Sequence, residues 1–221
     1  MSNPTNNNND LHLKLQAESL DEMATRKPYM RTLAGITYEV GPKVYKGSTD
    51  TELLCNSIVV NDGDYVWDIG TGTGLVALYA KKQGATYVLA TDLNPDALKN
   101  ARRNSKLLNL NIVVRKADVF GKVKTRFDVI TWNPPFTDHP ATRSHDISFW
   151  DKNHVSVKKF FKNVSNHLKP GGRAYICWSS FGDTDLIKKI ADENGYKLEE
   201  VGHKEGKENF IYYVYQIHIK M

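Results

Sequence analysis

Cysteines are scarce in this 221-residue chain, and long apolar runs are missing. Cys55 and Cys177 are the only cysteines, and neither has a partner at metal-ligand or redox spacing. No stretch approaches the roughly 18 consecutive apolar residues that a membrane-spanning helix needs. The opening residues, MSNPTNNNND, have neither the basic start nor the apolar middle of a signal peptide. We therefore expect a cytoplasmic protein in a reducing setting, with no metal site and no membrane partner.

The composition favours a single globular domain with a small appendage. Charged residues make up 25% of the chain and hydrophobic residues 40%, with a formal net charge of +5. Nine basic residues fall between Lys99 and Arg126, and Asp118 is the only acidic residue in that span. Such a cluster is either a solvated surface or an electrostatic footprint for nucleic acid or an acidic protein.

Three parts of the chain differ in pattern. Residues 1–15 are polar and Asn-rich, so we expect a disordered tail. Residues 16–48 are expected to form an extension with a helix that starts at the capping-box spacing of Ser19 and Glu22, followed by a hairpin that turns around Gly41-Pro42. Residues 49–221 are expected to form the main domain, which begins with a helix.

The main domain alternates strand-like and helix-like segments from Tyr65 onward. The expected strands are 65–70, 86–92, 111–118, 126–132, 172–179, 196–204 and 209–219. Helices are expected at 74–84, 94–109, 156–168 and 183–195. This alternation predicts an α/β, doubly wound, mostly parallel sheet of seven strands in the order 3-2-1-4-5-7-6, with the last strand antiparallel. Ligands of such sheets bind beyond the carboxyl ends of the strands.

A glycine loop follows the first strand of this sheet. Asp68 is followed by Gly70, Gly72 and Gly74, so the spacing is G-x-G-x-G. A dinucleotide fingerprint has G-x-G-x-x-G, and here Leu75 occupies the third glycine position. The acidic Asp68 would repel a pyrophosphate but suits a cofactor with positive charge. The spacing favours S-adenosylmethionine over NAD, which stays the alternative.

The next two strands also end in acidic residues. Asp92 can accept hydrogen bonds from a ribose diol, and Asp118 falls where an adenine amino group would lie. Any one of these is more often a cap or turn residue. Three in succession around a glycine loop favour a nucleoside-containing cofactor. The expected cofactor-binding residues are Asp68, Gly70, Thr71, Gly72, Gly74, Asp92, Leu93, Asp118, Val119 and Asn133.

The fourth strand is followed by Asn133, Pro134, Pro135 and Phe136, which form the candidate catalytic motif. The Asn133 Oδ1 and the Pro134 carbonyl can accept both hydrogens of a planar –NH2 group, which directs its lone pair at a methyl carbon. Pro134 has no N–H to compete, and Phe136 would stack on the planar group. The competing interpretation is a Pro-Pro turn that only ends the strand.

These stretches resemble the small HemK-like class I S-adenosylmethionine methyltransferases, which include the release-factor glutamine methyltransferases. DIGTGTGLVALYA matches that group's cofactor loop, and NPPF matches its Asn-Pro-Pro-aromatic motif. TDTELL, residues 49–54, resembles the segment that covers the cofactor, which adds Thr49 and Thr51 to the expected set. The resemblance implies a Rossmann-like methyltransferase domain at 49–221. Gly47-Ser48 replaces the group's usual Pro-Arg.

The acceptor is left open by the sequence. We expect a protein glutamine, as in a release factor. The motif is shared with adenine-N6 and guanine-N2 methyltransferases, so a base of RNA or DNA is an alternative acceptor, and a small molecule is another. A non-catalytic scaffold is disfavoured by the intact Asp68, Asp92 and Asn133. Some relatives of this size act with a small activating partner protein, so such a partner is a further expectation.

A long polar loop, residues 137–154, follows the motif directly. Loops of this length are typical of lids and binding segments. We expect it to close over the acceptor, with His139, Arg143 and Trp150 as substrate-contacting residues. Arg143 would contact a phosphate or carboxylate, and Trp150 would stack.

Overall fold

The computed structural model describes residues 4–206 and 210–220, with side chains described from residue 12 onward. One seven-stranded sheet forms its centre, in the order β5-β4-β3-β6-β7-β9-β8. The strands are β3 (Tyr65–Ile69), β4 (Tyr87–Asp92), β5 (Val113–Lys116), β6 (Phe127–Trp132), β7 (Leu168–Ser179), β8 (Tyr196–Glu205) and β9 (Ile211–Ile219). β9 runs antiparallel to both neighbours, whereas the pairs from β5 to β7 are parallel. The predicted order and orientation are confirmed.

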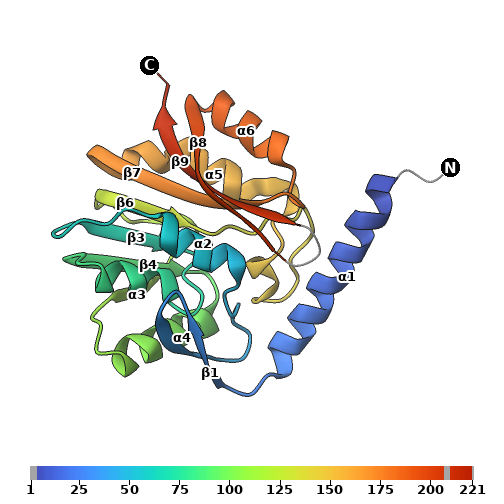
Figure 1. The fold of residues 1–221 in the computed structure, drawn as a ribbon, viewed down its shortest axis with the longest axis horizontal. Coiled ribbons are helices and arrows are strands. Elements are labelled where there is room, and N and C mark those ends of the chain that lie inside the picture. Colours follow the sequence, from blue (N-terminus) through green and yellow to red (C-terminus); the bar gives the residue numbers. More distant parts are fainter. Residues whose placement is uncertain (1–3, 207–209, 221) are drawn as a thin grey trace.

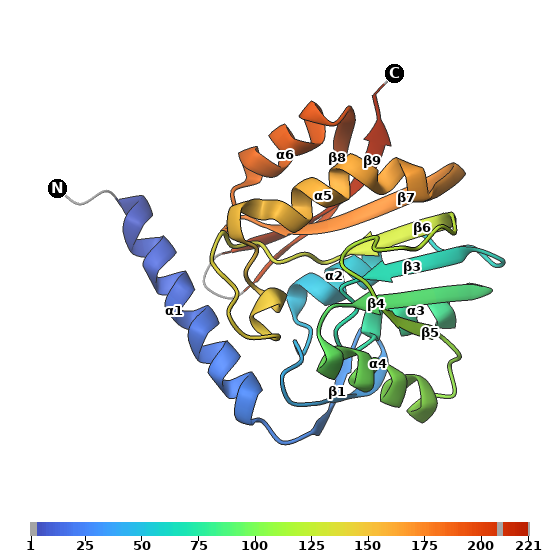
Figure 2. The same cartoon turned by 180° about the vertical axis from the view of Figure 1, so that it is seen from behind.

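Helices cover both faces of the sheet (Figures 1 and 2). One face carries α2 (Thr49–Ser57), α3 (Leu75–Lys82) and α4 (Pro95–Leu107), and the other carries α5 (Val155–Asn163) and α6 (Thr184–Glu193). The β5–β6 connection, residues 117–126, contains no helix, so the sheet is thinly covered at its β5 edge. Short 3-10 turns lie at Asp146–Ser148, Lys152–His154 and Val164–His167.

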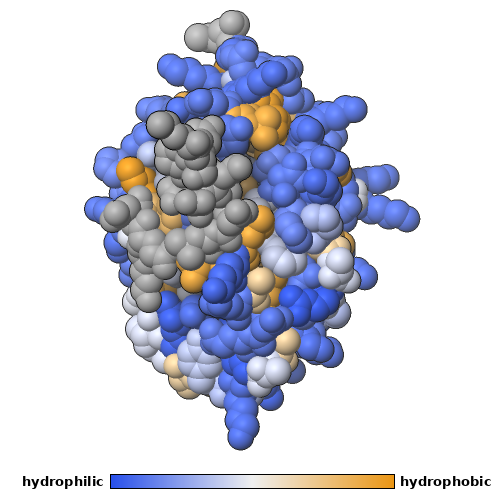
Figure 3. Space-filling view, turned by 90° about the vertical axis from the view of Figure 1, so that its right-hand side faces the viewer, coloured by the Kyte–Doolittle hydropathy of each residue, from blue (hydrophilic) through white to orange (hydrophobic). Residues whose placement is uncertain are grey.

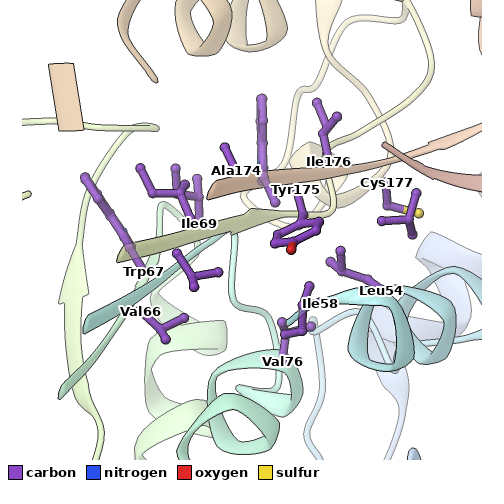
Figure 4. Close-up of a cluster of buried hydrophobic side chains, with 14 of the residues drawn as sticks. Leu54, Ile58, Val66, Trp67, Ile69, Val76, Ala174, Tyr175, Ile176 and Cys177 are labelled. Carbon is purple, nitrogen blue, oxygen red and sulfur yellow. The ribbon is translucent and has the colours of Figure 1, made fainter. Parts of the chain in front are cut away.

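The core lies on both faces of the sheet, between it and these helices. The central strands β3 and β6 are therefore buried along almost their whole length. Trp67 and Tyr175 are essentially buried, and Figure 4 shows them with side chains from α2 and α3. Trp67 also packs edge-on against Phe120. Phe120 belongs to the helix-free β5–β6 connection, so this aromatic contact holds that connection against the sheet.

The N-terminal segment differs from its prediction. Instead of a disordered tail over residues 1–15, α1 spans Pro4–Thr25, so Ser19 and Glu22 lie inside a helix rather than at its start; residues 1–3 lie outside the described residues. His12, Gln16, Leu20 and Met23 are buried and recur at helical spacing. This face of α1 packs on the body, which provides the stabilisation that the polar sequence lacks.

α1 lies along the side of the molecule toward which the parallel strands point (Figure 2). The surface around it is largely hydrophilic, with small separate hydrophobic areas (Figure 3). Its contacts include the loop after β6, where Leu20 and Met23 form a small cluster with Trp150. Farther along α1, His12 packs on Phe181 and Phe210. α1 therefore braces the loop that was expected to act as a lid.

The hairpin also lies earlier than predicted. β1 (Tyr29–Leu33) and β2 (Ile36–Val40) pair antiparallel, and Ala34 and Gly35 form the turn with φ of 49° and 68°. Two consecutive positive φ angles match the twist of a tight hairpin, which Pro42 cannot supply because its φ is negative. Among the described residues, no helix is long and apolar enough to cross a membrane.

Candidate active site

A cavity of about 470 Å³ opens at the carboxyl ends of β3, β4, β5 and β6. Its floor is the glycine loop between β3 and α3. Thr71 N donates to the Thr91 carbonyl and Gly74 N to the Thr71 carbonyl, both at 2.8 Å. The positive φ angles of Gly70, Gly72 and Gly74 let the loop fold this tightly. Cβ atoms are therefore absent where a ligand would approach the backbone.

Asp68 supplies the strongest electrostatic feature of this cavity. Its carboxylate is 2% exposed and accepts hydrogen bonds from Thr71 Oγ1 at 2.6 Å and Thr131 Oγ1 at 3.0 Å. Among the residues that the structure describes, no cation pairs with it. Burial raises the pKa of Asp68 to about 7, although the Thr71 hydrogen bond lowers it. A buried carboxylate with neutral donors only is suited to receive a cationic ligand group.

Asp92 and Asp118 line the same cavity. Asp92 Oδ2 accepts from Gly72 N at 2.9 Å and Oδ1 from Asn94 N at 2.8 Å, and burial raises its pKa. Each carboxylate oxygen has two lone pairs, so Asp92 retains the capacity to bind a diol. Asp118 instead pairs with Lys159 Nζ on α5 at 2.6 Å. Lys159 was not predicted from the sequence, and it lines the cavity beside Asp118.

Most of the predicted cofactor residues meet at this cavity. Those that line it are Thr51, Asp68, Gly70, Thr71, Gly72, Asp92, Leu93, Asp118, Val119 and Asn133. Gly74 lies outside the lining, because it begins α3 and packs against Ala101 of α4. Thr49, at the start of α2, is also outside the lining. Val119 adopts φ of 53°, a strained conformation for a β-branched residue, and shapes the wall beside Asp118.

A second, smaller cavity of about 50 Å³ adjoins the first. Asn133, Tyr45 and Ser148 line both cavities, so the two meet at these residues. The remaining lining of the small cavity is mainly aromatic: Asp50, Pro134, Phe136, Phe149, Phe181 and Tyr212. Pro135 faces the large cavity, whereas Pro134 and Phe136 face the small one. The Asn-Pro-Pro-Phe motif therefore forms the partition between them.

The amide of Asn133 is held in one orientation. Its Nδ2 donates to Asp50 Oδ2 at 2.7 Å and reaches Thr51 Oγ1 at 3.4 Å. Asp50 is 2% exposed, and its other oxygen accepts from Tyr45 Oη at 3.0 Å. Asn133 Oδ1 is buried and has no hydrogen-bond partner among the described residues. The amide thus offers a buried acceptor with unused capacity.

Asp50 and Tyr45 are functional candidates that the sequence reading missed. Asp50 stands between the predicted Thr49 and Thr51, but an acidic residue in the first turn of a helix is ordinarily explained by the helix dipole. Its contact with Asn133 joins positions 83 residues apart. The sequence contained one indication of this contact. TDTELL and NPPF are parts of the same family resemblance, so the two segments would lie next to each other in the fold.

The loop 137–154 forms part of both cavity walls, through Ala141, Ile147, Ser148 and Trp150 among others. Trp150 Nε1 donates to Gln16 Oε1 at 2.9 Å, and Gln16 Nε2 donates to Thr137 Oγ1 at 2.9 Å. Gln16 of α1 therefore forms hydrogen bonds near both ends of the loop, at Thr137 and at Trp150.

Two of the predicted substrate residues lie outside both cavities. Arg143 forms ion pairs at 2.8 Å with Asp146, which is completely buried, and with Asp21 of α1. His139 packs on the Trp150 ring, with centroids 4.2 Å apart. Arg143 is therefore placed to hold the loop against α1, and Trp150 is the predicted substrate residue that reaches a cavity.

Comparison with known proteins places this geometry in a family. Residues 46–193, more than half of the chain, match the family model described as Methyltransferase small domain. The chain belongs to this family. It is a HemK-like class I methyltransferase, and S-adenosylmethionine is its cofactor.

Two curated relatives and one solved structure resemble this methyltransferase. A Methanocaldococcus jannaschii protein with the provisional name protein N5-glutamine methyltransferase is 33% identical, over 76% of this chain and 88% of its own length. The release factor glutamine methyltransferase of Streptococcus pneumoniae is 27% identical, over 70% of this chain and 63% of its length. The T. thermophilus 16S rRNA N2 G1207 methyltransferase, in complex with AdoMet and guanosine, shares the fold, with a TM-score of 0.66 and 19% identity over 88% of this chain and 50% of its own.

The residues present fit the cofactor. Asp68 offers a buried carboxylate without a cationic partner among the described residues, which suits the ammonium group. Asp92 offers acceptors for the ribose hydroxyls, and Asp118 with Val119 lines the end where an adenine would lie. When bound, S-adenosylmethionine supplies an electrophilic methyl group on a sulfonium, which leaves as a neutral thioether.

Proposed function

We propose that this methyltransferase methylates a planar nitrogen, the side-chain amide of a glutamine in a protein. One observation carries the proposal: Asn133 Oδ1 is buried, unpartnered among the described residues, and located where the large and small cavities meet. A buried acceptor without a donor is costly, so a ligand that brings an N–H group would satisfy it.

The chemistry follows from that acceptor. An amide nitrogen is a weak nucleophile because its lone pair is delocalised into the carbonyl. Asn133 Oδ1 and the Pro134 carbonyl would each take one of its hydrogens, and the nitrogen lone pair would then point toward the large cavity. Asp50 prevents the Asn133 amide from presenting Nδ2 instead of Oδ1. Catalysis of this kind depends on alignment, for which about 7–11 kcal/mol is available in well-oriented systems.

The lining of the small cavity suits the flat group of an amide. Phe136, Phe149 and Tyr45 surround this space of about 50 Å³, so a terminal carboxamide would lie among aromatic faces. The names of the two curated relatives, both glutamine methyltransferases, support the same acceptor. Phe136 would pack against the flat face of the amide.

A labelling experiment tests the acceptor. The purified protein is incubated with methyl-labelled S-adenosylmethionine and a cell extract separated into protein, RNA and small-molecule fractions. We expect label in the protein fraction, as N5-methylglutamine in digested peptides, and loss of that label with Asn133→Ala. Label in RNA would establish an adenine-N6 or guanine-N2 methyltransferase instead, and label in the small-molecule fraction would establish a metabolite acceptor.

The same experiment tests for a small activating partner protein. Purified protein fractions are combined with the enzyme in the presence or absence of the remaining extract. A requirement for the extract at saturating acceptor would identify a partner, whereas full activity without it would show that the chain acts alone.

A further inference from the structure

The β5 edge of the sheet carries a concentration of positive charge that the methyl-transfer site does not use. Six basic side chains there are exposed and form neither an ion pair nor a side-chain hydrogen bond with any described residue: Lys106, Arg115, Lys116, Lys122, Lys124 and Arg126. They come from the end of α4, from β5 and from the connection to β6. We refer to these six residues as the basic edge.

The charge of the basic edge is uncompensated within the molecule. Asp118, the one acidic residue between Lys99 and Arg126, is already paired with Lys159. Nearby cations that do have partners are Arg102, which donates to the Val114 carbonyl, Arg103, which pairs with Glu39, and Lys99, which pairs with Asp96. Six like charges on one edge repel one another, and a bound anion would offset this repulsion.

The opposite edge of the sheet carries charges of both signs. β8 exposes Glu199, Glu200 and Glu205 together with Lys197 and Lys204. The excess of positive charge is therefore a property of the β5 edge and not of both edges. This local excess attracts a polyanion to the β5 edge.

The chemistry of the basic edge favours a nucleic-acid backbone over an acidic protein. A stable protein interface needs a desolvated core with few charged residues. From residue 99 to 126, Leu107 is the only apolar side chain that is mostly exposed. Cations from three separate segments match phosphates repeated along a chain, and binding of this kind is driven by counterion release.

Two features favour double-stranded RNA in particular. No exposed aromatic side chain lies in residues 99–126, so the basic edge has no platform on which unpaired bases could stack. Asn109 and Asn111 are exposed beside the basic residues and can bond to ribose 2′-hydroxyl groups, which DNA lacks. We propose that the basic edge is a docking surface for double-stranded RNA, bound through phosphate and ribose without base readout.

The position of this surface connects it to the site. β5 ends at Lys116, and the next three residues, Ala117 to Val119, line the large cavity. RNA on the basic edge would therefore lie beside the mouth of the cofactor cavity. The docking surface does not depend on which acceptor is methylated, and it would orient the enzyme on an acceptor that is held by RNA.

Fluorescence anisotropy with a labelled RNA duplex of about 20 base pairs tests the proposal directly. We expect binding that weakens steeply with salt. The double substitution Arg115→Gln/Lys116→Gln should weaken binding about tenfold and reduce the slope of log Kd against log salt by about 2. The matched control is Lys188→Gln/Lys189→Gln, which removes two exposed cations from α6 and should change neither quantity.

Several outcomes would overturn the docking surface. Wild-type binding by the β5 variant, equal losses in the control variant, or no binding at low salt would remove the basic edge as the site. Equal affinity for a DNA duplex of the same length would contradict the assignment to RNA. Equal displacement by polyglutamate at matched charge would indicate an acidic protein partner instead. Both variants alter exposed side chains, and an unchanged Tm confirms that they fold.

Discussion

Asn133 Nδ2 lies 2.7 Å from Asp50 Oδ2, and this contact joins the start of α2 to the loop after β6. Asp50 is buried, and Tyr45 donates to its second oxygen. The contact decides which atom of the Asn133 amide faces the two cavities. If the Asn133 amide could turn freely, it would present its Nδ2 donor as readily as its Oδ1 oxygen. Only Oδ1 can accept a hydrogen bond from the –NH2 group of the glutamine amide that is proposed to be methylated.

Removing Asp50 should therefore reduce turnover without loss of cofactor. Asp50→Ala deletes a hydrogen bond to a charged group, about 1.5–3 kcal/mol, so we expect kcat to fall roughly tenfold to a hundredfold. Methyl transfer to the acceptor identified by labelling measures kcat, and calorimetry with adenosylhomocysteine measures the cofactor site. Glu52→Gln, on the same helix but paired with Lys204 at the surface, is the control. An Asp50→Ala enzyme with wild-type kcat would rule out the orienting role.

Cofactor affinity should depend on pH through Asp68. The pKa of its buried carboxylate is raised to about 7, so in the free protein it becomes neutral as pH falls below 7. Only the ionised carboxylate attracts an ammonium group, and we expect the Kd of adenosylhomocysteine to rise by up to tenfold per pH unit between about pH 7 and 5.5. Calorimetry at several pH values measures this trend. Asp68→Asn should bind more weakly and show a flat profile; a sloping profile in that variant would assign the proton to another group.

The Asp68 carboxylate also makes the free energy of unfolding depend on pH. Burial favours its neutral form, so the folded pKa exceeds the unfolded value of 3.8. The stabilisation is fully present below the unfolded pKa and is lost as pH rises through about 7. Urea unfolding from pH 5 to 8 should show this loss in the wild-type protein, and the loss should be smaller in Asp68→Asn. Identical pH dependence in the two proteins would contradict the raised pKa.

Gly74 should not tolerate a side chain. Its φ is 87°, and an added Cβ would lie 3.1 Å from the Ala101 Cβ and 3.2 Å from the Ala101 Cα. We expect Gly74→Ala to lower the free energy of unfolding by about 1–3 kcal/mol, from backbone strain together with the clash. Gly171→Ala is the matched control, since φ there is 75° and no atom lies within 4 Å of the added Cβ. Equal losses of stability in both variants would show that the contact with α4 does not matter.

α1 should detach when its packing face is reduced. Leu20 is completely buried and contacts Trp150 through the small cluster with Met23. Leu20→Ala should destabilise this docking by about 2–5 kcal/mol, because it leaves a cavity in that cluster. Hydrogen exchange should then accelerate in α1 and in residues 137–151. Glu18→Ala, at an exposed position of the same helix, should leave the exchange unchanged. Protection that persists in Leu20→Ala would show that the Arg143–Asp21 ion pair and the Gln16 hydrogen bonds hold the helix.

The sheet order was readable from the chain because strand and helix periodicities are local properties, and right-handed crossovers leave few ways to arrange them. The glycine loop and the residues after Ile69, Asp92 and Trp132 were predicted for the same reason. In a parallel sheet, strand ends come to one edge wherever they stand in the sequence. This rule predicts that Asp68, Asp92 and Asn133 lie close together, and all three line the large cavity.

Other features depended on distant partners. The sequence of α1 is polar enough to suggest disorder, yet the segment is helical. Its Leu20 and Met23 pack against Trp150, which lies more than 100 positions later in the chain. Arg143 was expected at an acceptor, but Asp146 and Asp21 take its guanidinium. Asp50 acquires its role through Asn133, 83 residues later. The local sequence pattern determines which backbone conformation a segment prefers. The partner of a buried side chain, polar or apolar, depends on long-range packing, and no short stretch of the sequence contains that information.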